Sequence, residues 1–215
     1  MAARTISINI TSDSVCPWCF VGKRRLEKAM TTFQGKHPNV TFDIQWHPYQ
    51  LNPTMTAPMG KRDFYVSKFG AARAPQMQAT MQAVGAAEGI AFNYDGVVSN
   101  SFDSHRLIHW AKQFNKQSEM VEQVFRLYFE NANNNNLGDV NALSEAAERA
   151  GLDRNQATQF LTSENDADTV RQAVLESQRR GIHGVPHFSI DHKYTLSGAQ
   201  EPDAFVEIFE ELIQA

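Results

Sequence analysis

Cysteine is scarce in this chain: its 215 residues include two, Cys16 and Cys19, and both lie in the run VCPWC. Without further cysteines, the chain has no framework of several structural disulfides and no second internal pair to which a disulfide could pass. The sequence also lacks a long uninterrupted apolar run, and its first residues alternate between apolar and polar side chains. It therefore predicts neither a signal peptide nor a membrane-spanning helix, and we expect a cytoplasmic protein with no membrane partner.

An excess of basic residues is absent as well. Lys and Arg number 20 against 24 Asp and Glu, which gives a formal net charge of −4 at pH 7. Domains that bind nucleic acids usually carry concentrated positive charge, so this balance argues against a nucleic-acid partner. Hydrophobic residues make up 42% of the chain, enough to bury a core in one domain or in one domain with an insertion. The oligomeric state is left open by the composition.

Hydrophobic periodicity predicts a strand, a helix and a second strand near the start of the chain. Apolar residues alternate with polar ones over residues 5–11 and again over residues 40–46, which is the pattern of strands. Between them, residues 22–33 place apolar side chains at helical spacing. Two strands joined by a helix in this way normally run parallel, so we predict a βαβ unit.

The remainder of the chain predicts helices followed by a hairpin. Residues 53–180 contain several segments with helical spacing and no comparable strand. Strand pattern returns at VPHFSI and, after a turn, at YTLSG, and Pro202 then opens a last amphipathic helix. We therefore predict an α/β fold of the order βαβ…ββα. Residues 1–52 and 181–215 would form one domain, and residues 53–180 a helical insertion domain.

The position of the cysteine pair predicts its chemistry. Cys16 follows the first predicted strand and precedes the first predicted helix, and Pro17 suits the first helical position because it has no N–H to leave unpaired. The Cys16 sulfur would then lie at the positive end of the helix, which stabilises a thiolate. Cys19 lies most of a turn further along and is more enclosed. We predict that Cys16 attacks and Cys19 resolves the mixed disulfide, while Pro17 and Trp18 tune the site through helix geometry and shielding from water.

Two other uses of the pair are weaker. A structural disulfide between such close residues would close a very small loop and gain little from loop entropy. A zinc site would need His183 and His187 of HGVPH as further ligands, and these lie far beyond the roughly 12–15 residues that separate the halves of finger-type sites. A CxxC pair at the strand–helix junction of a βαβ unit is typical of redox centres. We therefore expect no metal and no tightly bound cofactor.

Several motifs together resemble a known family. VCPWC at the first helix and GVP before the returning strand are the main ones, and DSVCPWCFVGKRRLE, WHPYQLNP, SHRL, GIHGVPHFSID and YTLSGAQ extend the likeness along nearly the whole chain. The chain thereby resembles the DsbA-like branch of the thioredoxin superfamily, and within it the FrnE-like oxidoreductases. This resemblance implies a thioredoxin-like fold whose helical insertion covers the active-site face. It also implies a cis peptide bond between Val185 and Pro186 opposite the CxxC motif, with the Val185 backbone free to pair with an extended substrate.

The function that the resemblance implies is thiol–disulfide exchange with protein or small-molecule thiols, with glutathione as a candidate co-substrate. Two alternatives stay open. FrnE-like proteins are similar to 2-hydroxychromene-2-carboxylate isomerases and kappa-class glutathione transferases, which implies a glutathione-dependent isomerase or transferase acting on a small aromatic or polyketide-like substrate. Those enzymes typically place a serine where Cys16 stands, and the second cysteine, Cys19, argues against this alternative. The other alternative is a peptide-binding or chaperone-like module in which the pair is only a redox switch.

Other polar residues are expected at the surface. The run Lys23, Arg24 and Arg25 predicts a solvated face of the first helix. We also expect three histidines at the surface rather than in catalysis: His47, His105 and His109.

Overall fold

The computed structural model describes residues 4–214 of the chain. Its strands are β1 (Arg4–Ser12), β2 (Val40–Pro48), β3 (Met59–Gly60), β4 (Val97–Val98), β5 (His187–Ile190) and β6 (Tyr194–Ser197). Its helices are α1 (Pro17–Lys36), α2 (Lys61–Phe69), α3 (Ala74–Ala87), α4 (Phe102–Ala111), α5 (Gln117–Phe129), α6 (Val140–Arg149), α7 (Arg154–Leu161), α8 (Ala167–Arg179) and α9 (Pro202–Gln214). No helix within this described range is long and apolar enough to cross a membrane.

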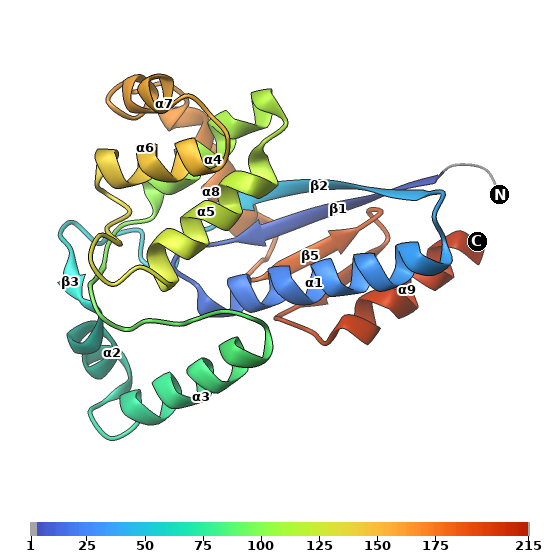
Figure 1. Cartoon of the computed structure of the whole chain (residues 1–215), viewed down its shortest axis with the longest axis horizontal. Helices are drawn as coiled ribbons and strands as arrows, with labels where there is room; N and C mark the ends of the chain where they lie inside the picture. The colour runs from blue at the N-terminus through green and yellow to red at the C-terminus, as the bar shows by residue number, and fades with distance from the viewer. Residues whose placement is uncertain (1–3, 215) are drawn as a thin grey trace.

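Four strands form the central sheet, in the order β2-β1-β5-β6 (Figure 1). β1 runs parallel to β2, with Ile8 opposite Ile44. On its other side β1 is antiparallel to β5, which forms a hairpin with β6. The alternating β1 residues Ile6, Ile8 and Ile10 are all buried, as expected of a central strand covered on its apolar face. The sheet confirms the predicted parallel βαβ unit and the predicted hairpin.

Helices α1 and α9 lie side by side along the sheet and share an aromatic core with it (Figure 1). The ring of Phe33 in α1 lies 5.4 Å from that of Phe209 in α9, and the ring of Phe188 in β5 lies 4.9 Å from that of Phe205 in α9. All four side chains are fully buried. Edge-on aromatic packing of this kind holds the two helices and the sheet in one α/β unit, in agreement with the predicted α/β class.

Two groups of helices lie between β2 and β5 in sequence, on either side of the N-terminal end of α1 (Figure 1). One group, α4–α8, packs internally and against β2, and the other, α2 and α3, forms a separate lobe. The short strands β3 and β4 pair beside α2. Neither α2, α7 nor this small ladder was anticipated from the sequence. The reason is visible for α2, which buries only Lys61 and so has no apolar stripe to detect.

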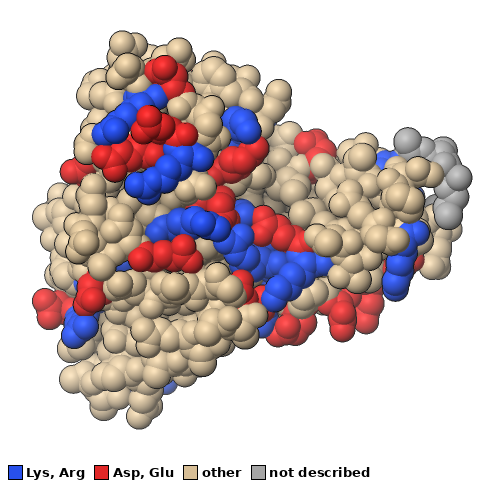
Figure 2. Space-filling model, viewed as in Figure 1, with Lys and Arg blue, Asp and Glu red and all other residues tan. Residues whose placement is uncertain are grey.

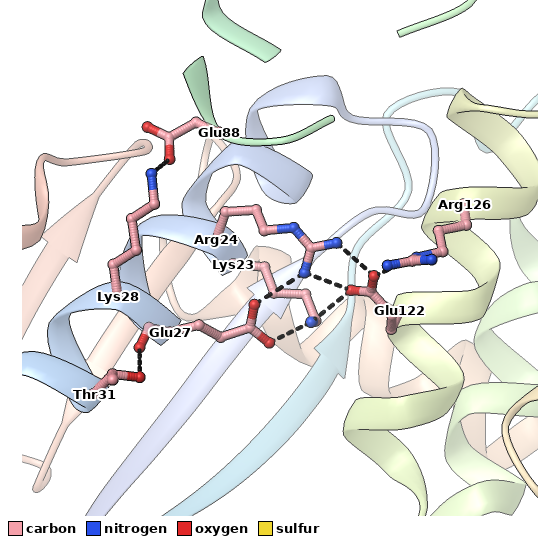
Figure 3. A network of polar contacts seen from close by, with 8 residues as sticks. All are labelled: Lys23, Arg24, Glu27, Lys28, Thr31, Glu88, Glu122 and Arg126. Carbon is pink, nitrogen blue, oxygen red and sulfur yellow. Dashed lines mark hydrogen bonds and ion pairs between the residues drawn. The ribbon is translucent and has the colours of Figure 1, made fainter. Parts of the chain in front are cut away.

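The prediction that Lys23, Arg24 and Arg25 form a solvated helix face is wrong. Lys23 is 4% exposed, because α1 packs close to α5 and Lys23 and Arg24 face Glu122 of that helix. Lys23 and Arg24 both bind Glu122, and Figure 3 shows the two cations converging on this carboxylate. Arg25 instead binds Glu88 at 2.8 Å. Charged side chains therefore gather in a band where α1 meets α5, whereas the lobe of α2 and α3 is mostly uncharged in Figure 2.

Candidate active site

The CPWC motif lies where β1 passes into α1, as the sequence predicts. Cys16 is the N-cap residue of α1, with extended backbone angles (φ −92°, ψ 112°), and Pro17 is the first helical residue. The Cys16 N–H donates to the carbonyl of Asp13 at 3.0 Å, and the Cys19 N–H donates to the carbonyl of Cys16 at 3.1 Å. This turn places the Cys16 sulfur at the start of a helix of 20 residues.

The loop before β5 faces the first cysteine across the site. The Val185–Pro186 peptide bond is cis, which confirms what the resemblance implied. The Cys16 thiol donates to the Val185 carbonyl oxygen, with 3.5 Å between sulfur and oxygen. The structure therefore brings Cys16, Val185 and Pro186 together from opposite ends of the chain. Trp18 is 42% exposed and lies at the rim of the site.

The two cysteines have different surroundings, and both are free thiols. Cys16 lines an open cleft, whereas Cys19 lies behind it and is 1% exposed. Burial raises the pKa of the Cys19 thiol well above its usual value, and the neighbouring Cys16 sulfur raises it further. The Ser12 side chain hydrogen-bonds Cys19 and acts in the opposite direction. Both thiols are therefore buried, Cys16 in the lining of the cleft at 5% exposure and Cys19 as a protonated thiol at 1% exposure.

A buried carboxylate, which the sequence analysis missed, organises the turn before the cysteines. Asp13 is fully buried and accepts hydrogen bonds from the N–H groups of Val15 at 3.4 Å and Leu51 at 2.6 Å. His105 of α4 lies 3.3 Å from the same carboxylate through Nε2. The prediction that His105 is a surface residue is therefore wrong, because α4 packs directly beside this turn. The only available signal was an acidic residue between an apolar strand and an apolar helix start.

A cleft of about 470 Å³ opens beside Cys16, between the start of α1 and the lobe of α2 and α3. Aromatic and aliphatic side chains line most of it, together with several polar residues. Trp18, Leu51 and Met77 line it while being 42%, 40% and 38% exposed, respectively. Exposed apolar side chains gathered at one cleft mark a binding surface rather than chance exposure. Cys16 is one of the residues that line this surface.

Three tyrosines contribute to the wall, and a buried lysine contacts one of them. The rings of Tyr65 and Tyr94 meet edge to face at 5.4 Å, and both residues line the cleft with Tyr128. Burial raises the pKa of Tyr94 to about 12, so its hydroxyl stays protonated at neutral pH. Lys61, 2% exposed, donates to the backbone carbonyls of Tyr128 and Asn93, and its ammonium lies 4.4 Å from the centre of the Tyr128 ring. Burial lowers the pKa of Lys61 to about 8.

A metal centre has no ligand set in the part of the chain that the structure describes. Across residues 4–214, no three His, Cys, Asp or Glu side chains gather as they would around a metal ion. His187, one of the two histidines considered for a zinc site, lies on β5 opposite Ser197 of β6.

Comparison with known proteins gives consistent matches along the chain. The model of the DSBA-like thioredoxin domain matches residues 7–210. The uncharacterized protein YwbO of Bacillus subtilis (strain 168) is 28% identical over 204 residues, which is 94% of each protein. The probable DsbA oxidoreductase SCO1869 of Streptomyces coelicolor is 30% identical, and its crystal structure has a TM-score of 0.84 over 96% of this chain and 89% of its own.

Two more distant structures share the fold alone. A 2-hydroxychromene-2-carboxylate isomerase is 12% identical, with a TM-score of 0.69 over 97% of this chain and 96% of its own. The cytosolic disulfide reductase DsbM of Pseudomonas aeruginosa, solved with GSH, is 15% identical, with a TM-score of 0.63 over 97% of this chain and 100% of its own.

Proposed function

This chain belongs to the DSBA-like thioredoxin domain family, and from that premise we propose that it is a thiol–disulfide oxidoreductase whose CPWC pair carries the reaction. One observation supports the proposal above the others. The Cys16 sulfur lies at the start of α1, at one end of an apolar cleft, with the buried thiol of Cys19 behind it. Neither a structural disulfide nor a metal site requires this difference between two neighbouring sulfurs.

In the reductive direction the reaction consists of two exchanges. The Cys16 thiolate attacks one sulfur of a substrate disulfide, so that a Cys16–substrate disulfide forms and the other half leaves as a thiolate that takes up a proton. Cys19 then loses its proton and attacks the Cys16 sulfur. The Cys16–Cys19 disulfide forms, and the second half of the substrate leaves as a thiol. Two electrons pass from the cysteine pair to the substrate. Two molecules of an external thiol restore the pair by the same steps in reverse and are themselves oxidised to a disulfide.

The residues around the pair have separate roles in this scheme. Pro17 begins α1, so that the first-turn N–H groups and the helix dipole favour an anion at Cys16. Trp18 shields the sulfur from water at the rim of the cleft. Val185 and Pro186 form the opposing wall, and the Val185 backbone offers hydrogen bonds to an extended substrate segment. These roles are part of the proposal.

We further propose that glutathione is the thiol that exchanges with the pair and that the protein is located in the reducing cytosol. The fold shared with DsbM, a protein named as a cytosolic disulfide reductase and solved with GSH, supports this choice. The proposed division into a thioredoxin-like domain and a helical insertion is supported by the sheet order, because all four strands of the large sheet come from residues 4–48 and 187–197.

The decisive experiment compares two single variants with the wild type in a single turnover, the reduction of glutathione disulfide by pre-reduced protein. Cys16→Ser should abolish exchange because it removes the attacking sulfur. Cys19→Ser should still react once and accumulate a mixed disulfide with glutathione, visible as added mass that a reductant removes. Equal turnover by the wild type and Cys16→Ser would refute the proposal. Turnover of a small aromatic substrate by Cys19→Ser without any disulfide exchange would instead identify an isomerase or transferase.

A further inference from the structure

The charged residues that line the cleft beside Cys16 are Lys68 and Arg73, and both are positive. Neither has an Asp or Glu partner within the described part of the chain, whereas Arg62 on the same helix as Lys68 binds Asp95 at 2.9 Å. Both side chains are exposed, and no acidic residue lines the cleft with them, although the chain has a formal net charge of −4. Charge of one sign in a cleft with apolar walls concentrates ligands of the opposite sign.

The ammonium group of Lys68 lies beside aromatic rings that line the cleft. Its ammonium lies 5.4 Å from the centre of the Phe64 ring and 5.8 Å from that of Phe69, and both rings line the cleft. The stem of the lysine therefore runs along the apolar wall, and its charge lies at the edge of that wall. A ligand with an apolar body against these rings would bring a terminal group close to this ammonium.

Helix ends add to the positive field of the cleft. Arg73 is the N-cap residue of α3, and Cys16 is the N-cap residue of α1. Neither helix has an acidic residue in its first turn to neutralise the positive end of its dipole. The first-turn residues Pro17 and Met77 line the same cleft, so both helix starts face it. The cleft thus combines two side-chain cations, two helix starts and an apolar wall.

On the basis of the proposed function, we infer that the cleft takes a small acidic thiol or disulfide with an apolar body. Its carboxylate binds Lys68 and Arg73, its apolar part packs against the tyrosine and phenylalanine wall, and its sulfur reaches Cys16. The volume of about 470 Å³ is within the usual range for small-molecule sites, roughly 300–1,000 Å³. Cys16 is 5% exposed, which does not suit attack on a disulfide within a folded protein surface.

The test compares two aromatic disulfides with pre-reduced protein: 5,5′-dithiobis(2-nitrobenzoate), which carries two carboxylates, and 2,2′-dithiodipyridine, which carries none. In a single turnover each is reduced to two thiols while the Cys16–Cys19 disulfide forms, so no further reactant is needed. We expect Lys68→Gln and Arg73→Gln each to lower the second-order rate constant for the dianion by about two- to fivefold, with multiplied effects in the double variant. The rate constant for the neutral probe should stay within about twofold of the wild type.

Matched controls separate charge from structure. Arg62→Gln makes the same charge change on α2, outside the cleft, and should leave the ratio of the two rate constants unchanged. Lys68 lies in the last turn of α2, where a cation also suits the helix dipole, so the unfolding temperature of each variant is measured alongside. Lys68→Arg keeps the charge and should restore the wild-type ratio. Added salt should lower that ratio in the wild type and much less in the double variant.

The outcomes distinguish this inference from the function on which it rests. An unchanged anion-to-neutral ratio in the double variant would overturn the inference while leaving the oxidoreductase function intact. A wild type that reduces neither probe, or a Cys16→Ser variant that reduces both at the wild-type rate, would instead refute the function. If Lys68→Gln and Lys68→Arg both lower the ratio of the rate constants for the dianionic and the neutral probe, the effect does not come from charge, and this result would also contradict the inference.

Discussion

The contact between α1 and the loop that carries Pro186 can be tested at Gly22. A Cβ atom added at this residue would lie 2.9 Å from Pro186 Cγ and 3.1 Å from Phe188 Cζ. Phe188 is fully buried, and the contacting atom of Pro186 belongs to its pyrrolidine ring, so neither neighbour is the end of a flexible side chain that could move aside. We therefore predict that Gly22→Ala forces the loop away from α1, and with it the residue that faces Cys16.

Gly35 in the same helix provides the matched control, because no atom lies within 4 Å of the Cβ added there. Replacing glycine by alanine inside a helix is worth up to about 1 kcal/mol through helix propensity, and both variants gain some of it. Overpacking costs about 1–3 kcal/mol, and only Gly22→Ala incurs it. The difference in unfolding free energy between the two variants therefore isolates the steric cost, at about 1–3 kcal/mol.

Urea unfolding of the wild type and both variants measures this difference directly. For a chain of this size, each kcal/mol also shifts the melting temperature by about 2–4 °C. Gly22→Ala should in addition slow thiol exchange at Cys16, whereas Gly35→Ala should not. If Gly22→Ala proves as stable as Gly35→Ala, the contact with Pro186 is looser than the distances indicate, and the reasoning fails.

Two further predictions concern buried charges. Burial alone would raise the pKa of Glu122, but hydrogen bonds and charges from Arg24 and Lys23 outweigh it and lower that pKa to about 2. The Glu122 carboxylate therefore stabilises the folded state above its unfolded pKa of about 4.3, and this contribution is lost as the pH falls toward 2. Between pH 5 and 2, the unfolding free energy should therefore change less steeply with pH in Glu122→Gln than in the wild type. Arg106, 3% exposed, donates to backbone carbonyls within residues 160–165. Arg106→Lys leaves some of these unpaired and should lower the unfolding free energy by about 1–3 kcal/mol in urea titrations, while an unchanged midpoint would contradict this role.

Local patterns explain why much of the thioredoxin-like core could be predicted. Alternation in β1 and β2 reflects burial of one face, and the position of Pro17 after Cys16 marks the start of α1. These features depend on neighbours within a few residues, so the sequence alone carries them. The cis bond at Pro186 was different, because it came from the family resemblance and not from the pattern around it.

The remaining parts of the site depend on contacts between distant segments. Asp13 and His105 meet only because α4 packs beside the turn after β1. Lys61 is buried because its ammonium finds two backbone carbonyls and an aromatic ring far along the chain. A histidine considered from the sequence alone is most often a surface residue, which is why the prediction for His105 was wrong, and the sequence around Lys61 led to no prediction of its burial. The charge of the cleft likewise emerges only when α2 and α3 are placed opposite α1.

Helix α1 connects the chemistry of the site to its specificity. One face of α1, at Gly22, packs directly on Pro186, which limits the position of the loop opposite Cys16. Another face carries Lys23 and Arg24, which bind Glu122 of α5 and so attach α1 to the helices between β2 and β5 (Figure 3). Because the CPWC motif begins this same helix, the sulfur is positioned by contacts with both parts of the molecule. In the proposed function, the distance between the Cys16 sulfur and a substrate in the cleft therefore depends on the whole of this packing, not on the CPWC turn alone.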